Sequence, residues 1–285
     1  MVNSRPYRPR LAFSTLACPE WDALEVVERA RTMGFDAIEW RGGIDGHAGP
    51  QLAVADRRAI RGAMDDHDLV SIAVTTYTDL VHPSAAVREA SIDELLRHAE
   101  VAADLGAPNL RAFPGERSDD ASDEELLERA TDTLRRAADG LAGTGIAIAL
   151  EPHDAFMSSV VVAGLLRHVD HPQVGAVWDA GNTWSIGEAP EEGIEALGPW
   201  LRYVQVKDGV GRRPDWRLTL LGEGEVPLRA AIALLVRDHP DVPVSIEWER
   251  PWEPDLPPAE VALPGGLAHL RAVYANVHRV TKETP

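Results

Sequence analysis

The sequence predicts an α/β fold, a single (β/α)8 barrel that spans residues 1–285. Short apolar runs rich in β-branched residues alternate with longer helical patterns, which is typical of right-handed βαβ units and a parallel sheet. Eight such runs in one chain favour a closed barrel over an open sheet. A length of 285 residues suits one barrel, and no linker divides the chain.

The candidate strands are spaced so that most gaps leave room for a helix. They are residues 10–15, 35–40, 69–75, 109–113, 146–151, 174–179, 202–208 and 242–249. Helical patterns fill 19–34, 84–106 and 122–143, and each ends at a glycine. The third opens with Ser122 and Glu125 in the spacing of a capping box. The Pro-rich residues 250–266 are interpreted as a loop over the top of the barrel, with a partner-binding arm as the alternative.

Composition excludes several classes of function. The formal net charge of −18 disfavours nucleic acid as a partner, because an acidic surface repels phosphates. No GxGxxG follows the first strand, so the usual dinucleotide fingerprint is missing. The N-terminus lacks the apolar run of a signal peptide, and no run of about 18 apolar residues predicts a membrane span. With Cys18 as the only cysteine, we expect no internal disulfide and a cytoplasmic location.

Oxygen-bearing side chains stand where the last four strands end. They are Glu151, Asp179, Gln205, Glu247 and Glu249, with Lys207 beside them. In "YVQVKD" the polar Gln205 and Lys207 share one face of a strand that otherwise looks buried. Carboxylates that converge at the C-terminal rim of a barrel repel one another unless they share a proton or a cation. The pattern favours a divalent metal with oxygen ligands, Mn²⁺ or Mg²⁺, over a cluster of helix caps and surface groups.

The ordered motifs "IALEPH", "VGAVWDAGN", "YVQVKD", "LLGEGEVP" and "VSIEWE" resemble those of the xylose isomerase-like TIM barrel family, also called sugar phosphate isomerase/epimerase. Tagatose 3-epimerase, inosose isomerase and dehydratase, 3-dehydroshikimate dehydratase and endonuclease IV belong to this group. The resemblance runs from the first strand to the last helix. The ordered set is specific for the superfamily and says little about the substrate.

The resemblance implies one divalent metal ion held by Glu151, Asp179, Gln205 and Glu247. It also implies that Glu151 and Glu247 are catalytic and move a proton next to a carbonyl through an enediolate. Most members have His where this chain has Gln205. An amide oxygen in place of an imidazole nitrogen makes the site harder and favours Mn²⁺ or Mg²⁺ over Zn²⁺.

Further residues near the same rim are candidates for substrate binding. Except for the two arginines, which could clamp a carboxylate or a hydroxyl, each also has a structural interpretation: a hydrogen-bonding histidine, a turn residue in "DAGN", a lysine paired with Glu223 or Glu249, or tryptophans that fill space. The candidates are His153, Asn182, Lys207, Arg111, Arg41, Trp184 and Trp252.

The predicted function is a divalent-metal-dependent isomerase or epimerase of a keto-sugar, an inosose or a related polyol ketone. A lyase of the same fold, either a dehydratase or a 3-keto-sugar deglycosidase, is the alternative, and Gln205 and Asn182 favour it modestly. A non-catalytic sugar-binding barrel ranks lower. An endonuclease would need a His-rich site and a basic face, and neither is present. We expect a small carbohydrate or polyol ketone as the partner, no nucleic acid and no membrane, with a homodimer as an open alternative to a monomer.

Overall fold

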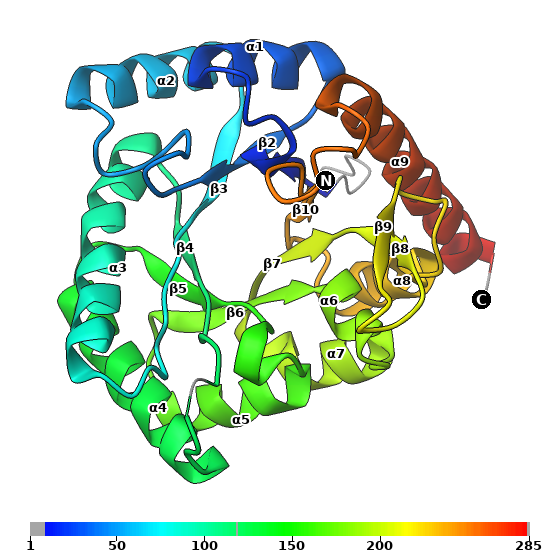
Figure 1. The fold of residues 1–285 in the computed structure, drawn as a ribbon. Helices are drawn as coiled ribbons and strands as arrows, with labels where there is room; N and C mark the ends of the chain where they lie inside the picture. Colours follow the sequence, from blue (N-terminus) through cyan, green and yellow to red (C-terminus); the bar gives the residue numbers. More distant parts are fainter. Residues whose placement is uncertain (1–8, 118, 284–285) are drawn as a thin grey trace, which may run out of the picture.

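The computed structural model describes residues 9–117 and 119–283. Residues 1–8, which belong to the N-terminal segment tested for a signal peptide, and the last two residues of the predicted domain lie outside this part. Eight parallel strands close into a barrel inside a ring of helices, which confirms the predicted fold (Figure 1). In barrel order the strands are β1 (Leu11–Ser14), β10 (Val244–Ile246), β7 (Leu201–Val206), β6 (Val174–Asp179), β5 (Ala147–Leu150), β4 (Asn109–Ala112), β3 (Val70–Thr75) and β2 (Ala37–Arg41).

The helices pack their apolar faces on the outside of the barrel. They are α1 (Ala23–Met33), α2 (Val54–Asp66), α3 (Ala85–Leu105), α4 (Asp123–Gly140), α5 (Ser159–Val169), α6 (Ala180–Ser185), α7 (Pro190–Leu197), α8 (Leu228–Asp238) and α9 (Ala259–Glu283), with short 3-10 turns η1 (Thr15–Ala17), η2 (Asp154–Phe156) and η3 (Gly198–Trp200). The capping box of α4 is present: Ser122 Oγ accepts from the backbone N–H of Glu125, whose carboxylate accepts from the N–H of Ser122.

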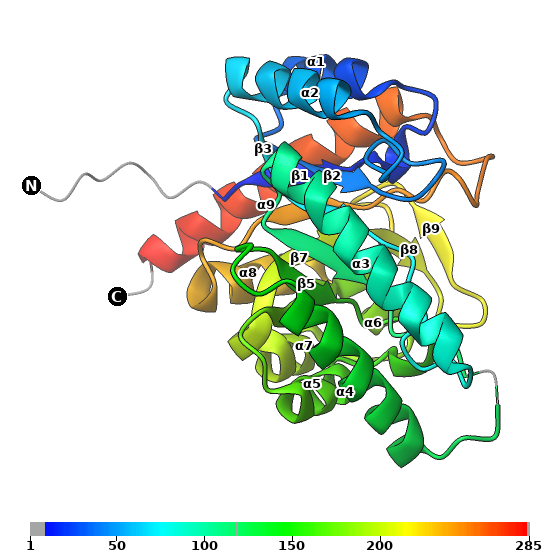
Figure 2. The same cartoon turned by 90° about the vertical axis from the view of Figure 1, so that its left-hand side faces the viewer.

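Two features differ from the sequence prediction. The loop predicted over 250–266 is wrong beyond Pro258, because α9 begins at Ala259. Pro264 lies inside this helix, and the burial of Leu263 and Leu267 offsets its missing backbone donor. The second feature is an antiparallel pair, β8 (Asp208–Val210) and β9 (Arg217–Thr219), that follows β7. Figure 2 shows this pair at the opposite end of the barrel from the C-terminal end of α9.

The barrel interior is layered by strand parity, because residues two positions apart point to the same side. A lower layer of small and apolar residues fills the centre: Ala12, Ala37, Ile72, Ala73, Ala149, Val177 and Tyr203. Two residues further along four of these strands come polar side chains of the same parity: Glu39, Glu151, Asp179 and Gln205. The register Asp179↔Gln205 and Ser245↔Gln205 sets β6, β7 and β10 side by side at this height. Period-two alternation therefore brings polar groups together above an apolar plug.

Among residues 9–117 and 119–283, none of the helices combines the length and the apolar character that a bilayer-spanning segment requires.

Candidate metal centre and substrate cavity

Three buried carboxylates meet at the C-terminal rim of the barrel. Glu151 follows β5, Asp179 ends β6, and Glu247 follows β10. Each offers an oxygen that lies within 4.8 Å of the other two. All three residues are at most 3% exposed. Such a group of like charges needs cations or a shared proton, since water cannot screen it.

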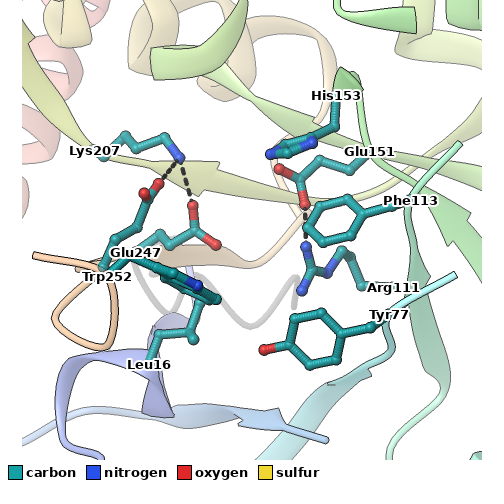
Figure 3. Close-up of a pocket in the computed structure, with 10 residues that line it drawn as sticks. Leu16, Tyr77, Arg111, Phe113, Glu151, His153, Lys207, Glu247 and Trp252 are labelled. Carbon is teal, nitrogen blue, oxygen red and sulfur yellow. Dashed lines mark hydrogen bonds and ion pairs between the residues drawn. The ribbon is translucent and has the colours of Figure 1, made fainter. Parts of the chain in front are cut away.

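Two basic side chains of the protein lie against this cluster. Lys207 Nζ is 2.8 Å from Asp179 Oδ2 and 2.7 Å from Glu247 Oε2, and it also pairs with Glu249 (Figure 3). Burial alone would lower the pKa of Lys207, but these carboxylates outweigh it and raise the pKa well above its usual value. Arg111 Nη1 donates to Glu151 Oε2 at 2.8 Å. The carboxylates still outnumber the basic groups, so the cluster favours a further cation.

Gln205 offers a further oxygen next to this cluster. It is fully buried on β7, and its Nε2 donates to Glu247 Oε1 at 3.0 Å and to Glu39 Oε1 at 2.9 Å. Both amide protons are thereby used, while Oε1 is buried with no hydrogen-bond partner among the described residues. An orphaned buried oxygen is costly unless something binds it. Three carboxylates and one amide oxygen form a donor set that fits a hard divalent ion such as Mg²⁺ or Mn²⁺.

Glu151 is held from two sides. Asn182 Nδ2 donates to its Oε1 at 3.0 Å, and Arg111 donates to its Oε2. Burial, together with the charges of Glu247 and Asp179, raises the pKa of Glu151 to about 7, against the opposing effect of Arg111. A carboxyl group that titrates near neutrality can both accept and return a proton. The side chain therefore suits general acid–base chemistry as well as metal binding.

His153 lies beside Glu151 and lines the same cavity. Its Nδ1 is 2.6 Å from Asp154 Oδ1, and its ring packs on Phe113 with 4.2 Å between centroids. Burial lowers the pKa of His153, but the bond to Asp154 and the charge of Glu151 outweigh burial and raise it. The imidazole is thus fixed against Phe113, next to the candidate base.

A cavity of about 330 Å³ opens above these groups. Its lining residues are Leu16, Tyr77, Arg111, Phe113, Glu151, His153, Lys207, Glu247, Glu249 and Trp252. Figure 3 shows Glu151 and Glu247 entering from opposite sides, with the aromatic side chains and Leu16 along one wall. The volume lies at the small end of the range for ligand sites, and an apolar wall facing a few polar groups is usual for them.

The residues singled out in the sequence lie in three positions. Those that line the cavity are Glu151, Glu247, His153, Lys207, Arg111 and Trp252. Asp179, Gln205 and Asn182 lie behind it and contact Lys207, Glu247 and Glu151, respectively. Arg41 and Trp184 are not lining residues.

Arg41 and Trp184 differ in their distance from the cavity wall. Arg41 Nε donates to Tyr77 Oη at 3.0 Å, and its guanidinium lies 5.7 Å from the Trp252 ring, so it bridges two side chains of the wall. Trp184 instead stacks under the guanidinium of Arg212 at 3.6 Å.

Sequence reasoning missed four residues of this region. Tyr77, Phe113 and Leu16 line the cavity from the segments that follow β3, β4 and β1. A census of every residue after a strand would have found them, whereas attention to charged residues did not. Glu39 is the fourth, and its signal was a carboxylate inside the otherwise apolar run "AIEW". Burial raises the pKa of Glu39 to about 7, with a further contribution from Glu247.

A family profile described as "Xylose isomerase-like TIM barrel" matches residues 27–273. A curated relative, the uncharacterized protein YihM of Escherichia coli (strain K12), is 22% identical over 205 residues, which cover 68% of this chain and 61% of that protein. The match therefore spans less than two thirds of the relative.

Solved structures share the fold at low identity. The IOLI protein with a bound zinc atom superposes with a TM-score of 0.81 and 21% identity, over 94% of this chain and 99% of the other. D-psicose 3-epimerase crystallised with D-fructose superposes with a TM-score of 0.77 and 16% identity, over 93% of this chain and 99% of the other. The probable 3-DHS dehydratase AsbF from Bacillus anthracis superposes with a TM-score of 0.76 and 21% identity, over 92% of this chain and 98% of the other.

Proposed function

The chain belongs to the xylose isomerase-like TIM barrel family, and from that premise we propose that it is a divalent-metal-dependent isomerase or epimerase of a keto-sugar, an inosose or a related polyol ketone. The observation that carries the proposal is the convergence of Glu151, Asp179 and Glu247 beside a small cavity. Gln205, which donates to Glu247, adds a buried amide oxygen with no partner among the described residues. Epimerase and dehydratase relatives of the same fold are consistent with it.

The proposed ligands are Glu151, Asp179, Gln205 and Glu247. A bound Mg²⁺ or Mn²⁺ would supply Lewis-acid polarisation of a substrate carbonyl and so favour loss of the neighbouring proton. The ligand oxygens come from four adjacent strands of the closed sheet, β5, β6, β7 and β10. A site built on strands keeps its geometry better than a site built on loops.

Proton transfer is assigned to the two glutamates that face each other across the cavity. Glu151 and Glu247 come from different strands, so one can take a proton from one face of a flat substrate and the other can return it to the opposite face. Arg111 and Asn182 hold both oxygens of Glu151 in place. Lys207 pairs with Asp179, Glu247 and Glu249, so its ammonium compensates part of the negative charge of the site and holds Glu247 in place.

A lyase reaction is the second candidate. Loss of water or of an aglycone needs a proton donor for the leaving oxygen, and His153 lines the cavity next to Glu151. The same glutamates would remove the proton next to the carbonyl. Epimerase and lyase therefore differ in what happens after the same first step.

A substrate screen separates these candidates. Keto-sugars and inososes are incubated with the Mn²⁺-loaded protein in D₂O, and the products are analysed by NMR and mass spectrometry. An isomerase or epimerase incorporates deuterium next to the carbonyl without losing water, whereas a lyase gives a product lighter by water or by an aglycone. If metal binds but none of these compounds exchanges a proton or is converted, the proposal fails.

A further inference from the structure

A fourth buried carboxylate lies beside the proposed ligands. Glu39 stands on β2 with no exposed surface, and its parity points it into the barrel. Three donors reach it: Tyr203 Oη at 2.8 Å and Gln205 Nε2 at 2.9 Å on Oε1, and Ser245 Oγ at 2.7 Å on Oε2. None of the ion pairs found in residues 9–117 and 119–283 includes it. A buried carboxylate without a basic partner lowers the stability of a fold, so packing alone does not explain its place.

The contact with Gln205 has a directional consequence. The Gln205 amide has two donor hydrogens and one oxygen, and an amide can be turned so that these ends exchange places. In the observed orientation the hydrogens meet Glu39 Oε1 and Glu247 Oε1. The turned orientation would set the amide oxygen against two carboxylate oxygens, and this repulsion disfavours it. Of these two acceptors, Glu247 belongs to the proposed ligands and Glu39 does not.

We propose that Glu39 is a positioning residue that fixes the Gln205 amide with its oxygen free for the divalent ion. The inference rests on the metal site of the proposed function. Outer acceptors that orient metal ligands typically change metal affinity by about 10–100-fold when they are removed. Tyr203 and Ser245 satisfy the remaining capacity of Glu39 and hold the carboxylate in one rotamer.

The test is a double-mutant cycle read by Mn²⁺ affinity. Wild type, Glu39→Gln, Gln205→Ala and the double variant are titrated with Mn²⁺ by calorimetry, and circular dichroism with thermal unfolding checks each fold. Glu39→Gln should weaken Mn²⁺ binding by about 10–100-fold, because a side chain that also presents an amide N–H no longer favours one orientation of Gln205. In the Gln205→Ala background the same change should have little further effect.

Matched controls come from the other two donors. Tyr203→Phe and Ser245→Ala each remove one hydrogen bond to Glu39 and leave the bond to Gln205, so Mn²⁺ affinity should change less than threefold. Glu39→Asp keeps the charge but shortens the reach, so it should lose affinity as Glu39→Gln does. It also serves as the test if Glu39→Gln does not fold.

The outcomes that overturn the inference are separate from those that overturn the proposed function. A Glu39→Gln protein that binds Mn²⁺ like wild type removes the positioning role alone. An equal loss in both backgrounds does the same, because Glu39 would then act without Gln205. If folded wild-type protein binds no divalent ion, the proposed function and this inference fail together.

Discussion

The two halves of the cavity are built in different ways. One half consists of Glu151, Glu247 and Lys207, which stand directly after barrel strands whose register is fixed by hydrogen bonds. The other half is an aromatic wall defined by Tyr77, Phe113 and Trp252. Tyr77 and Trp252 belong to loops, and Trp252 is 55% exposed. We call the first half the strand side. The comparison suggests that the strand side determines which reaction is catalysed, whereas the aromatic wall determines which molecule binds.

The difference also explains how each half keeps its shape. Side chains on the strand side are locked by ion pairs and hydrogen bonds to one another, as in Lys207 with Asp179 and Glu247. The wall is joined by ring contacts: Phe113 lies against the Arg111 guanidinium at 3.8 Å and against Tyr77 at 6.2 Å. Arg111 therefore links the halves, since it also binds Glu151. Substitutions on the strand side should abolish chemistry, and those on the wall should change substrate affinity.

The largest effect is expected for the two facing glutamates. Glu151→Gln and Glu247→Gln should each lower turnover by about 10² or more, because each removes a proton-transfer group that is also a proposed ligand. The matched control is Glu249→Gln, which lies at the outer edge and pairs with Lys207. The fall in turnover of Glu249→Gln should be several-fold smaller than that of the other two variants. Steady-state kinetics with the substrate found in the screen measures all three, and equal losses would show that the wrong carboxylate of "EWE" has been chosen.

Substitutions of Gln205 test whether the strand side binds a metal ion. Gln205→Ala should weaken Mn²⁺ binding by roughly 1–3 kcal/mol, the scale for a missing buried polar partner. Gln205→His should keep binding but move preference toward Zn²⁺ or Co²⁺, since imidazole is a softer ligand. Calorimetric titration of both variants with Mn²⁺ and Zn²⁺ decides this. Unchanged Mn²⁺ affinity in Gln205→Ala would mean that Gln205 is not a ligand.

Trp252 tests the aromatic wall. Trp252→Ala should raise KM by about 2–10-fold with little change in kcat, the scale of one aromatic contact with a ligand. Its exposure makes a folding defect a minor concern. Trp184→Phe is the matched control, because Trp184 packs under Arg212 away from the cavity lining and its KM should stay at the wild-type value. A large fall in kcat for Trp252→Ala would break the division of roles between the two halves.

The strand side could be predicted from the sequence, because the alternation of side chains along each strand and the order of the strands determine where its residues lie. All eight barrel strands were predicted, and the three carboxylates that gather within 4.8 Å of one another are those picked from the strand ends. The wall was not accessible in the same way. Tyr77 and Leu16 reach the cavity through loop geometry, which depends on contacts between distant segments and not on local pattern.

Two other features were not predicted from the sequence, for similar reasons. The pair β8 and β9 consists of two three-residue strands, too short to show alternation. Asp208, at the start of β8, ties the loop after β9 to this pair, because its buried carboxylate accepts from the backbone N–H groups of Gly222, Gly224 and Val226. In the sequence Glu39 is only an isolated charged residue. Its role could not be predicted, because its partners Tyr203 and Ser245 lie more than 160 positions away in the chain.

The smallest expected effect concerns the loop after β2, which follows Arg41, the side chain that contacts Tyr77 and Trp252 of the wall. His98 is fully buried on α3, and its Nε2 accepts from the backbone N–H of Gly43 at 3.1 Å while Nδ1 lies 2.9 Å from the carbonyl oxygen of Glu94. This arrangement requires a neutral ring, because a protonated Nε2 cannot accept. Burial lowers the pKa of His98, and the nearby charges of Arg97 and Arg57 add to this, against the opposing effect of Glu94.

A lowered pKa in the folded state fixes the sign of the pH dependence. Below the ordinary histidine value of about 6.5 the unfolded chain binds the proton first, so folding stability falls as pH decreases and is unaffected above that value. A single proton gives a slope of at most about 1.4 kcal/mol per pH unit. His98→Gln keeps an acceptor for Gly43 and removes the titration, so its thermal unfolding midpoint should fall less than that of wild type between pH 7.5 and 5.5. If the two proteins lose stability in parallel, His98 does not hold this loop, and the wall must be anchored through Arg41 and Tyr77 instead.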